Sequence, residues 1–414
     1  MTTPGPHPAA PVENGVVSLP AGTTSTTPFS IEAGRHGAAG HVVVVGAGIV
    51  GLGAAAEAHR RGYRVSVVEQ ASSVVGSSVQ NFGHLCVTAQ AGEAREYALA
   101  ARERWLSLGS AAGFGVAQVG AHVVARTDAE LRLLAELAAE RGESEVRLLD
   151  AAQARAVVPV RPGPVVGGAH LPLDLQVDPR AAAPALAAWL EQQGVTFRWR
   201  TAARAVGTGR VETTAGRIEA DAVIVATHHD LDRLLPDLAA QVGLRRCRLH
   251  MLRVRPGAPS DPRFPGPLLT GWSMVRYAAF AACPSAADVA GELADAEPDG
   301  AAWDVNLMLT PQEDGTLIIG DTHVRAVDAP VFQDEAGYTV LLRLMTDLLG
   351  RDLDVVERWQ GTYATAPGRE FLVAEPEPGV HVATVTTGIG MTTGLGLAAH
   401  VLDRAGLDHA PLGA

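Results

Sequence analysis

The chain has 414 residues, 47% of them hydrophobic, which is ample for a large core and indicates two domains. No apolar run reaches the roughly 18 residues that a membrane span needs, and the net charge of -12 disfavours nucleic acid and anionic membranes as partners. All 33 basic residues are arginine, which excludes a Schiff-base lysine and ordinary pyridoxal-phosphate chemistry.

The first 38 residues are rich in Pro, Gly, Thr and Ala. They lack the apolar segment of a signal peptide, so residues 1–38 are predicted to form a flexible extension. Cys86, Cys247 and Cys283 are scattered through the chain, without the spacing of a metal site. These features favour a cytoplasmic protein that holds no metal.

A valine-rich strand followed by a glycine-rich turn is the first informative motif. The run Val42–Val45 is typical of a strand buried on both faces. Gly46 allows the tight turn after it, Gly48 lets the backbone approach a pyrophosphate, and Gly51 lets the next helix pack closely. The spacing predicts a dinucleotide site.

The elements that follow the turn support the same prediction. A helix over about 49–61 offers free N–H groups and partial positive charge where a pyrophosphate binds. The next strand, 64–69, ends in Glu69, whose carboxylate suits the hydroxyl groups of a ribose. Glu69 suits NAD and FAD equally, so these elements leave the dinucleotide open.

The middle of the chain alternates between helical and strand patterns. Asp178 and Pro179 are typical of the N-cap and first position of a helix. A buried strand over 221–227 can share a parallel sheet with the first valine strand. The expected helices cover about 91–112, 128–141, 179–193 and 334–349. Short strands are expected over 196–200, with a hairpin from 206–213 and 217–219, and a mainly β pattern from 245 to 325.

A second glycine-rich junction lies near the end of the chain. A strand over 380–385 precedes the small residues Gly388–Gly396, and a helix is predicted over about 394–404. This junction mirrors the first one, so it also suits close approach by a ligand.

Taken together, these pieces resemble the D-amino-acid-oxidase-like family of FAD-dependent amine oxidoreductases. The matching segments are Gly46–Gly51 with Glu69, the loop Gly76–Gly83, the strand Asp221–Thr227 and the junction Gly388–Gly396, in the order of that family. The resemblance implies an α/β fold, in which a Rossmann-like FAD-binding domain is interleaved with an α+β substrate domain that contains a large, mostly antiparallel sheet. The implied FAD-binding segments are 39–92, 172–235 and 356–414, and the implied substrate-binding segments are 93–171 and 236–355.

The resemblance also implies which residues contact the cofactor. In that family the first motif binds the ADP half of FAD, and the C-terminal junction lies beside the flavin ring. The residues expected to contact FAD are Gly46, Gly48, Ile49, Val50, Gly51, Glu69, Gln70, Ser77, Ser78, Asn81, Phe82, Gly83, Ala226, Thr227, Gly388, Ile389, Gly390, Met391 and Thr392.

Four segments are similar to the branch of this family proposed to oxidise aminophosphonates related to 2-aminoethylphosphonate. They are Asn81–His84, Arg276–Phe280, Gly320–His323 and Arg358–Tyr363. Sarcosine-oxidase relatives use a lysine near the flavin, and some attach flavin to a cysteine. This chain has no lysine, and no cysteine near the C-terminal junction, so the FAD is expected to be non-covalent, with oxygen or another electron acceptor.

The chemistry expected from this resemblance is hydride transfer from the amine-bearing carbon to flavin N5, followed by hydrolysis of the imine to an aldehyde or keto product. A small anionic amine needs arginine for its oxyanion, and Arg276 is the first choice. His84 is expected to orient the amine or take up a proton. The other candidates for substrate contacts are Tyr363, His323 and Gln360, with Arg325 and Arg369 in reserve.

Alternative interpretations come from three other classes. A secondary or D-amino acid oxidase or dehydrogenase is the nearest, followed by a flavin-binding protein without turnover and an NAD-dependent dehydrogenase. The cluster His228–Asp230 resembles a metal site, but adjacent side chains on an extended chain point to opposite faces. No further ligand is evident near this cluster, so a metal is not expected there.

Overall fold

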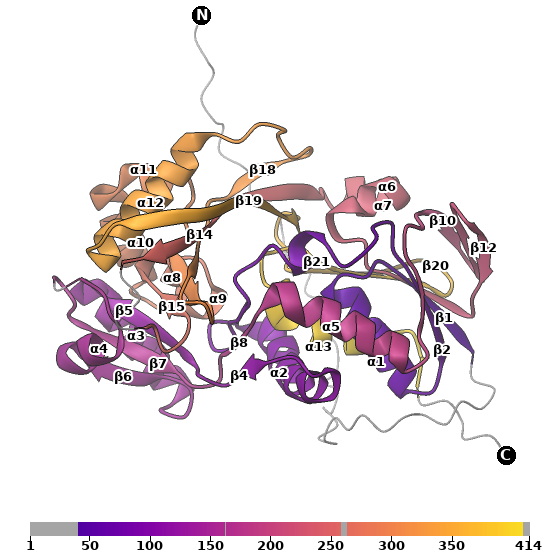
Figure 1. The fold of residues 1–414 in the computed structure, drawn as a ribbon, viewed down its shortest axis with the longest axis horizontal. Helices are drawn as coiled ribbons and strands as arrows, with labels where there is room; N and C mark the ends of the chain where they lie inside the picture. The colour runs from indigo at the N-terminus through magenta and orange to yellow at the C-terminus, as the bar shows by residue number, and fades with distance from the viewer. Residues whose placement is uncertain (1–39, 162, 258–262, 409–414) are drawn as a thin grey trace, which may run out of the picture.

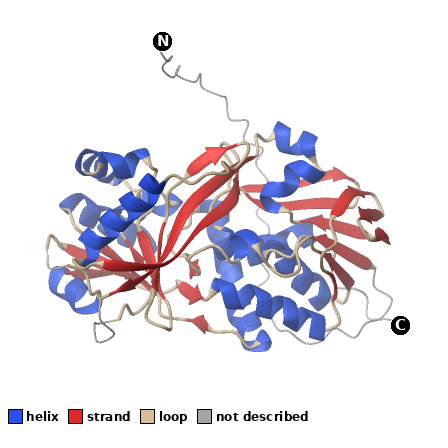
Figure 2. Ribbon diagram, turned by 45° about the horizontal axis from the view of Figure 1, so that its top comes forward, coloured by secondary structure: helices blue, strands red, loops and turns tan. Residues whose placement is uncertain are grey.

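The computed structural model describes residues 40–161, 163–257 and 263–408, and the extension expected over residues 1–38 lies outside them. Two large sheets lie on opposite sides of the molecule, each flanked by helices (Figures 1 and 2). No helix in these ranges is long and apolar enough to cross a membrane.

The first sheet has six strands in the order β20-β21-β13-β1-β2-β9. The valine run pairs in parallel with both β2 and β13, which confirms that the two buried strands share one sheet. β20 is antiparallel to β21 and closes one edge. The strands are β1 (His41–Val45), β2 (Arg64–Val68), β9 (Thr196–Arg198), β13 (Ala222–Val225), β20 (Phe371–Glu377) and β21 (Val380–Val385).

Four helices pack together beside this sheet: α1 (Ile49–Arg60), α2 (Gly92–Ala112), α5 (Pro179–Gln192) and α13 (Gly390–Arg404). Small residues allow the close contacts, because a Cβ on Gly53 would lie 2.9 Å from Leu395 Cδ2 and one on Gly396 would lie 2.2 Å from Tyr97 O. Asp178 caps α5 as predicted, accepting from the Arg180 N–H. α13 begins four residues before the expected start, so the second glycine-rich junction forms its first turns.

The chain between β9 and β13 forms a small three-stranded sheet, whose Val211 and Ile218 pack with Val43 and Val223 of the six-stranded sheet. It consists of β10 (Ala203–Gly207), β11 (Arg210–Thr213) and β12 (Gly216–Glu219). The segment 206–213, predicted as one arm of a hairpin, is itself a hairpin, since Gly209 adopts φ 79° between β10 and β11. Two short helices follow β13, α6 (Leu231–Leu234) and α7 (Pro236–Gln241).

The second sheet has nine strands and is antiparallel except where β15 pairs with β5. Its longest pair is β14 with β19, whose register runs from Arg245 opposite Thr365 to Pro256 opposite Leu353. The strands are β5 (Ala121–Ala125), β6 (Arg147–Asp150), β7 (Gly167–Leu171), β14 (Arg245–Pro256), β15 (Leu268–Leu269), β16 (Met308–Pro311), β17 (Leu317–Gly320), β18 (Val324–Ala326) and β19 (Leu353–Thr365). A small sheet, β3 (His84–Leu85), β8 (Leu175–Val177) and β4 (Val116–Ala117), lies between the two large ones.

The prediction of a mainly β pattern from 245 to 325 is wrong over 271–302. Alanine is the strongest helix former, and this stretch is rich in it. Its helices are α8 (Gly271–Met274), α9 (Ala278–Ala281), α10 (Ala286–Ala296) and α11 (Pro298–Ala302). The remaining helices are α3 (Asp128–Arg141), α4 (Ala151–Val157) and α12 (Glu335–Leu349), with 3-10 turns η1 (Gly76–Ser78) and η2 (His228–Asp230).

Two of the expected domain boundaries do not follow the sheets. α2, assigned to the substrate segments, packs against α13 beside the six-stranded sheet. β19, mostly assigned to the FAD-binding segments, pairs along its whole length with β14 of the nine-stranded sheet. We therefore propose that the division follows the two sheets, with α2 on the cofactor side and β19 on the substrate side.

Candidate active site

A cavity of about 660 Å³ lies where the carboxyl ends of β1, β2 and β13 meet β19, η1 and the start of α13. Ligands bind outside the carboxyl ends of parallel strands in open α/β sheets, so this is the expected place for a nucleotide. The loops after α8 and β17, from the nine-stranded sheet side, line its other end. Residues from the six-stranded sheet side and from the nine-stranded sheet side therefore both line the cavity.

Glycine is required at two positions of the first turn. Gly46 has φ 107°, and a Cβ there would lie 2.6 Å from the carbonyl oxygen of Ala226. A Cβ on Gly51 would lie 1.9 Å from Gly46 O, so only glycine lets α1 begin this close to β1. Gly48 is the N-cap of α1 and provides no side-chain cap. Ser78 Oγ accepts from the Ile49 N–H at 2.8 Å, and the following N–H groups of the first turn can donate to an anion.

Glu69 is fixed at the end of β2 by two backbone hydrogen bonds. Its Oε2 accepts from the Ala47 N–H and its Oε1 from the Ala71 N–H, both at 2.8 Å. The carboxylate also lines the cavity. Its remaining lone pairs can accept from the hydroxyl groups of a ribose.

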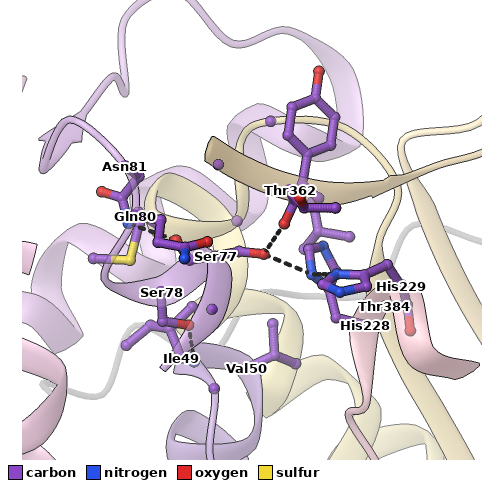
Figure 3. Close-up of a pocket in the computed structure, with 18 of the residues that line it drawn as sticks. Ile49, Val50, Ser77, Ser78, Gln80, Asn81, His228, His229, Thr362 and Thr384 are labelled. Carbon is purple, nitrogen blue, oxygen red and sulfur yellow. Dashed lines mark hydrogen bonds between the residues drawn. The ribbon is translucent and has the colours of Figure 1, made fainter. Parts of the chain in front are cut away.

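A chain of hydrogen bonds connects three distant segments around the cavity (Figure 3). His228 Nε2 accepts from the Ala364 N–H at 3.1 Å, so the proton of the neutral ring is on Nδ1, which lies 3.0 Å from Ser77 Oγ. Ser77 in turn donates to Thr362 O. Burial lowers the pKa of His228 to about 3, so the ring stays neutral. Through these contacts His228 links the chain after β13 to η1 and β19.

Several buried hydroxyl groups along the cavity are without partners among the described residues. They belong to Thr227, Thr384 and Thr387, and all three line the cavity. Buried polar groups are normally satisfied, so these hydroxyls fit a polar ligand such as a flavin nucleotide. Nearby, a Cβ on Gly388 would lie 3.4 Å from the ring of Tyr363, so this ring lies close to the backbone of the second glycine-rich junction.

Charged and aromatic groups gather at the end of the cavity away from Glu69. Arg276, Arg325 and Asp321 line it there, together with His323 and Tyr363. Neither Asp321 nor Asn306, which also lines this end, was expected from the sequence. Asp321 belongs to the segment Gly320–His323, which could have suggested it, whereas Asn306 lies in none of the motifs of the sequence.

Most residues expected to contact the cofactor do line the cavity, as do the candidate substrate residues Arg276, Tyr363 and His323. Gly51, Gly83 and Thr392 are outside the lining formed by the described residues. Gly51 lets α1 pack on Gly46, a Cβ on Gly83 would lie 2.0 Å from Val177 O, and Thr392 Oγ1 accepts from the Cys86 N–H at 3.0 Å. In the structure these three residues therefore make close backbone contacts or a hydrogen bond within the fold.

Two residues expected to contact the substrate, Gln360 and His84, lie outside the cavity lining that the described residues form. Gln360 is opposite His250 in the β14–β19 register and is not part of the cavity lining that the described residues form. His84 is buried, and its Nε2 lies 2.9 Å from Asp174 Oδ2. The His84 ring therefore points into the interior of the protein, where its Nε2 bonds to the buried carboxylate of Asp174.

His84, Cys86 and Asp174 bring three metal-ligating atoms within 4.8 Å of one another. This group was not foreseen from the sequence. Burial raises the pKa of the Cys86 thiol well above its usual value, and the nearby carboxylate of Asp174 adds to this effect. The thiol is therefore protonated in the metal-free protein, and a metal that bound here would have to displace this proton.

Comparison with known proteins identifies the family. The family profile described as "DAO: FAD dependent oxidoreductase" matches residues 41–404. No curated protein is significantly similar in sequence.

Solved structures share the fold at low sequence identity. Glycine oxidase from Bacillus cereus ATCC 14579 is 17% identical, with a TM-score of 0.70 over 89% of this chain and 95% of that one. FAD-bound L-alpha-glycerophosphate oxidase from Mycoplasma pneumoniae is 16% identical, with a TM-score of 0.70 over 90% and 97%. Iminodiacetate oxidase from Chelativorans sp. BNC1 is 21% identical, with a TM-score of 0.66 over 90% and 97%. The chain belongs to the DAO family of FAD-dependent oxidoreductases, and its cofactor is FAD.

Proposed function

We propose that this enzyme oxidises a small anionic amine, and that the substrate is an aminophosphonate such as 2-aminoethylphosphonate or an N-methyl or hydroxy derivative. The observation that carries the proposal is the pair of arginines, Arg276 and Arg325, in the same cavity as the FAD-binding motifs. Bound FAD would supply the acceptor for a hydride from the carbon that carries the nitrogen.

The two arginines are held by one carboxylate that is not part of the described cavity lining. Asp304 contacts Arg276 Nη1 through Oδ1 and accepts from Arg325 Nη1 through Oδ2 at 2.6 Å. Among the described residues, the hydrogen bonds of both arginines use Nη1 alone. Their Nη2 and Nε groups are therefore free to donate to an oxyanion, which guanidinium groups bind in pairs of hydrogen bonds.

The phenol of Tyr363 can assist the same oxyanion. Its side chain is half-buried at the cavity, and desolvation there raises the pKa of the phenol well above its usual value. The hydroxyl group therefore stays protonated and can donate a hydrogen bond. A neutral donor beside two cations suits the several acceptor oxygens of a phosphonate.

The substrates in the names of the structural neighbours are anionic, which supports an anionic substrate here. They do not distinguish a carboxylate from a phosphate or phosphonate. Glycine and iminodiacetate are amines that carry carboxylates, whereas L-alpha-glycerophosphate is a phosphate ester. The second candidate is therefore a secondary or D-amino acid, whose carboxylate the same arginines could bind.

An anaerobic titration tests the proposal. The purified, FAD-loaded protein is mixed with 2-aminoethylphosphonate, its N-methyl and hydroxy derivatives, sarcosine and D-alanine, and flavin absorbance is followed. Bleaching by an aminophosphonate at the lowest concentration supports the proposal, and preferential bleaching by an amino acid supports the second candidate. Normal FAD content with no bleaching by any amine would indicate a flavin-binding protein without turnover.

Arg276→Ala makes the anion site testable by itself. Loss of one guanidinium should raise the KM for the anionic amine at least about tenfold, since a charge-assisted hydrogen bond contributes about 1.5–3 kcal/mol. FAD content should remain normal. Arg217→Ala is the matched control, because Arg217 is exposed and pairs with Glu212 on the surface hairpin. An unchanged KM in Arg276→Ala would remove this residue from the anion site.

A further inference from the structure

The substrate end of the cavity contains a buried carboxylate that has no assigned role. Asp321 follows β17 and lines the cavity. Its side chain is only 6% exposed, and Oδ1 is buried without a hydrogen-bond partner among the described residues. Its backbone is fixed, because the Asp321 N–H donates to Asn306 O at 2.7 Å and the Asn306 N–H donates to Asp321 O at 2.8 Å. An ionisable group in this position is normally paired.

The neighbouring histidine also presents an acceptor to this carboxylate. His323 Nδ1 lies 2.8 Å from the backbone oxygen of Asp304. A carbonyl oxygen can only accept, so the proton of the ring is on Nδ1. Burial lowers the pKa of His323 to about 3, which keeps the ring neutral and leaves Nε2 as an acceptor. Nε2 lies 3.6 Å from Asp321 Oδ2.

Two acceptors therefore face each other beside two arginines, and the group that would satisfy them is a donor with more than one N–H. We propose that Asp321 and His323 receive the amine nitrogen of the substrate, and that Asp321 removes its proton. This inference rests on the proposed function, in which Arg276 and Arg325 hold the anionic end of the same molecule.

The proton transfer is a simple exchange of bonds. One N–H bond of the substrate ammonium breaks, an O–H bond forms on Asp321, and the electron pair stays on nitrogen. Only the neutral amine has a lone pair to support loss of hydride from the adjacent carbon. His323 accepts a second N–H through Nε2 and so orients the nitrogen without changing its own charge.

The surroundings of Asp321 suit a base that works near neutral pH. Burial raises the pKa of Asp321 to about 7, although the Arg276 guanidinium opposes this. A general base is most effective when its pKa is near the working pH. The other titratable or charged groups that face it are Arg276, Tyr277, Asp304, Arg325, Cys247 and Tyr363.

None of these neighbours changes its charge near pH 7. Burial raises the pKa of Cys247 to about 11 and also raises those of the two phenols. The arginines lower the pKa of Asp304 despite its partial burial, so it stays ionised. A transition near pH 7 in this group would therefore belong to Asp321.

Binding of two matched probes tests the proposal without turnover. The amine probe is 2-amino-2-methylpropane-1-sulfonate, which has no hydrogen on its amine-bearing carbon. The reference probe is 2-methylpropane-1-sulfonate, the same anion without the amine. Dissociation constants for the FAD-loaded protein are measured by calorimetry, and their ratio gives the preference for the amine.

The wild-type protein should prefer the amine probe at pH 8, and this preference should fall about tenfold at pH 6, because protonation removes the charge of a carboxylate with a pKa near 7. Asp321→Asn should reduce the preference at pH 8 at least tenfold, abolish its pH dependence and leave the reference probe within about twofold. Asp314→Asn is the control, because Asp314 is on the exposed turn of the same β16–β17 hairpin, paired with Arg253.

Two results would overturn the proposal: an unchanged preference in Asp321→Asn, or a wild-type preference that is flat from pH 6 to pH 8. The pH dependence of the wild-type preference needs no variant, so this measurement tests the proposal even if Asp321→Asn does not fold. Failure of the proposed function looks different. If no anionic amine bleaches the flavin, but the preference is lost in Asp321→Asn, the amine receptor stands and the proposed oxidation does not.

Discussion

His84 and Asp174 form a buried pair, with Nε2 of the ring 2.9 Å from Oδ2 of the carboxylate. Oδ1 of the same carboxylate accepts from the Thr88 N–H at 2.8 Å. Asp174 therefore fastens the segment after β3 to the turn before β8. The geometry indicates that His84 stabilises the fold beneath the active site.

We expect Asp174→Ala to lower the free energy of unfolding by on the order of 3 kcal/mol. Two buried donors, on His84 and Thr88, would lose their acceptor, and each unsatisfied group costs about 1–3 kcal/mol. Turnover of the folded fraction should stay within a few-fold of the wild type. Urea unfolding and steady-state kinetics measure these two effects. As a comparison, Asp178→Ala removes one exposed helix cap and should cost about 1 kcal/mol. A large loss of kcat with unchanged stability would instead indicate that His84 takes part in catalysis.

Glu69→Ala should weaken FAD binding by about 10–100-fold. The substitution removes a carboxylate that faces the cavity, and hydrogen bonds to charged groups contribute about 1.5–3 kcal/mol. Glu69→Gln should have a smaller effect, because the amide oxygen can still accept from one backbone N–H. The fluorescence of flavin released on dilution measures the affinity. Glu212→Gln, on the surface hairpin, is the control and should bind FAD normally. Equal affinity in all three variants would show that Glu69 does not contact the cofactor.

Gly51→Ala should prevent stable folding or cost at least about 3 kcal/mol. Its Cβ would lie 1.9 Å from the backbone oxygen of Gly46, which cannot move without displacing β1. Gly291→Ala is a matched change in α10, where a Cβ meets no atom within 4 Å. It should raise stability by up to about 1 kcal/mol, because alanine favours helix over glycine. Soluble yield and thermal unfolding compare the two. A Gly51→Ala protein as stable as the wild type would contradict the close packing of α1.

The lowered pKa of Glu57 predicts how the free energy of unfolding depends on pH. Burial by itself would raise the pKa of this carboxyl, but Arg60, Arg61 and Arg104 together lower it from 4.5 to about 2. Since the folded pKa is the lower one, the stabilisation is fully present above about pH 5 and is lost as the pH falls toward 2. The shift corresponds to about 3 kcal/mol. Arg61 also donates to Leu407 O and pairs with Asp403, so this group ties α1 to the end of α13.

Glu57→Gln should therefore be less stable than the wild type at pH 7, and its stability should change less between pH 5 and pH 3. Urea unfolding at each pH measures both. Glu103→Gln is the control, since Glu103 is 66% exposed on α2 and should retain the wild-type pH dependence. Parallel stability curves for Glu57→Gln and the wild type would be the contrary result.

The sequence by itself determined the cofactor end of this protein. Gly46, Gly48 and Gly51 after a valine strand, with Glu69 after the next strand, form a short-range pattern of well-defined backbone geometry. This pattern, with the resemblance that it supports, was enough to predict the fold class. The pattern over 271–302 did not distinguish its helices from the strands on either side of them.

Only the tertiary structure decided which side chains face the substrate. Asp321 and His323 follow β17, Arg276 follows α8, and Tyr363 is on β19, so their meeting depends on how distant strands pair. The direction of a side chain is set by the partners that the fold brings to it. His84 turned to a carboxylate 90 residues away, and Oδ1 of Asp321 was left without a hydrogen-bond partner among the described residues. No local pattern contains that information.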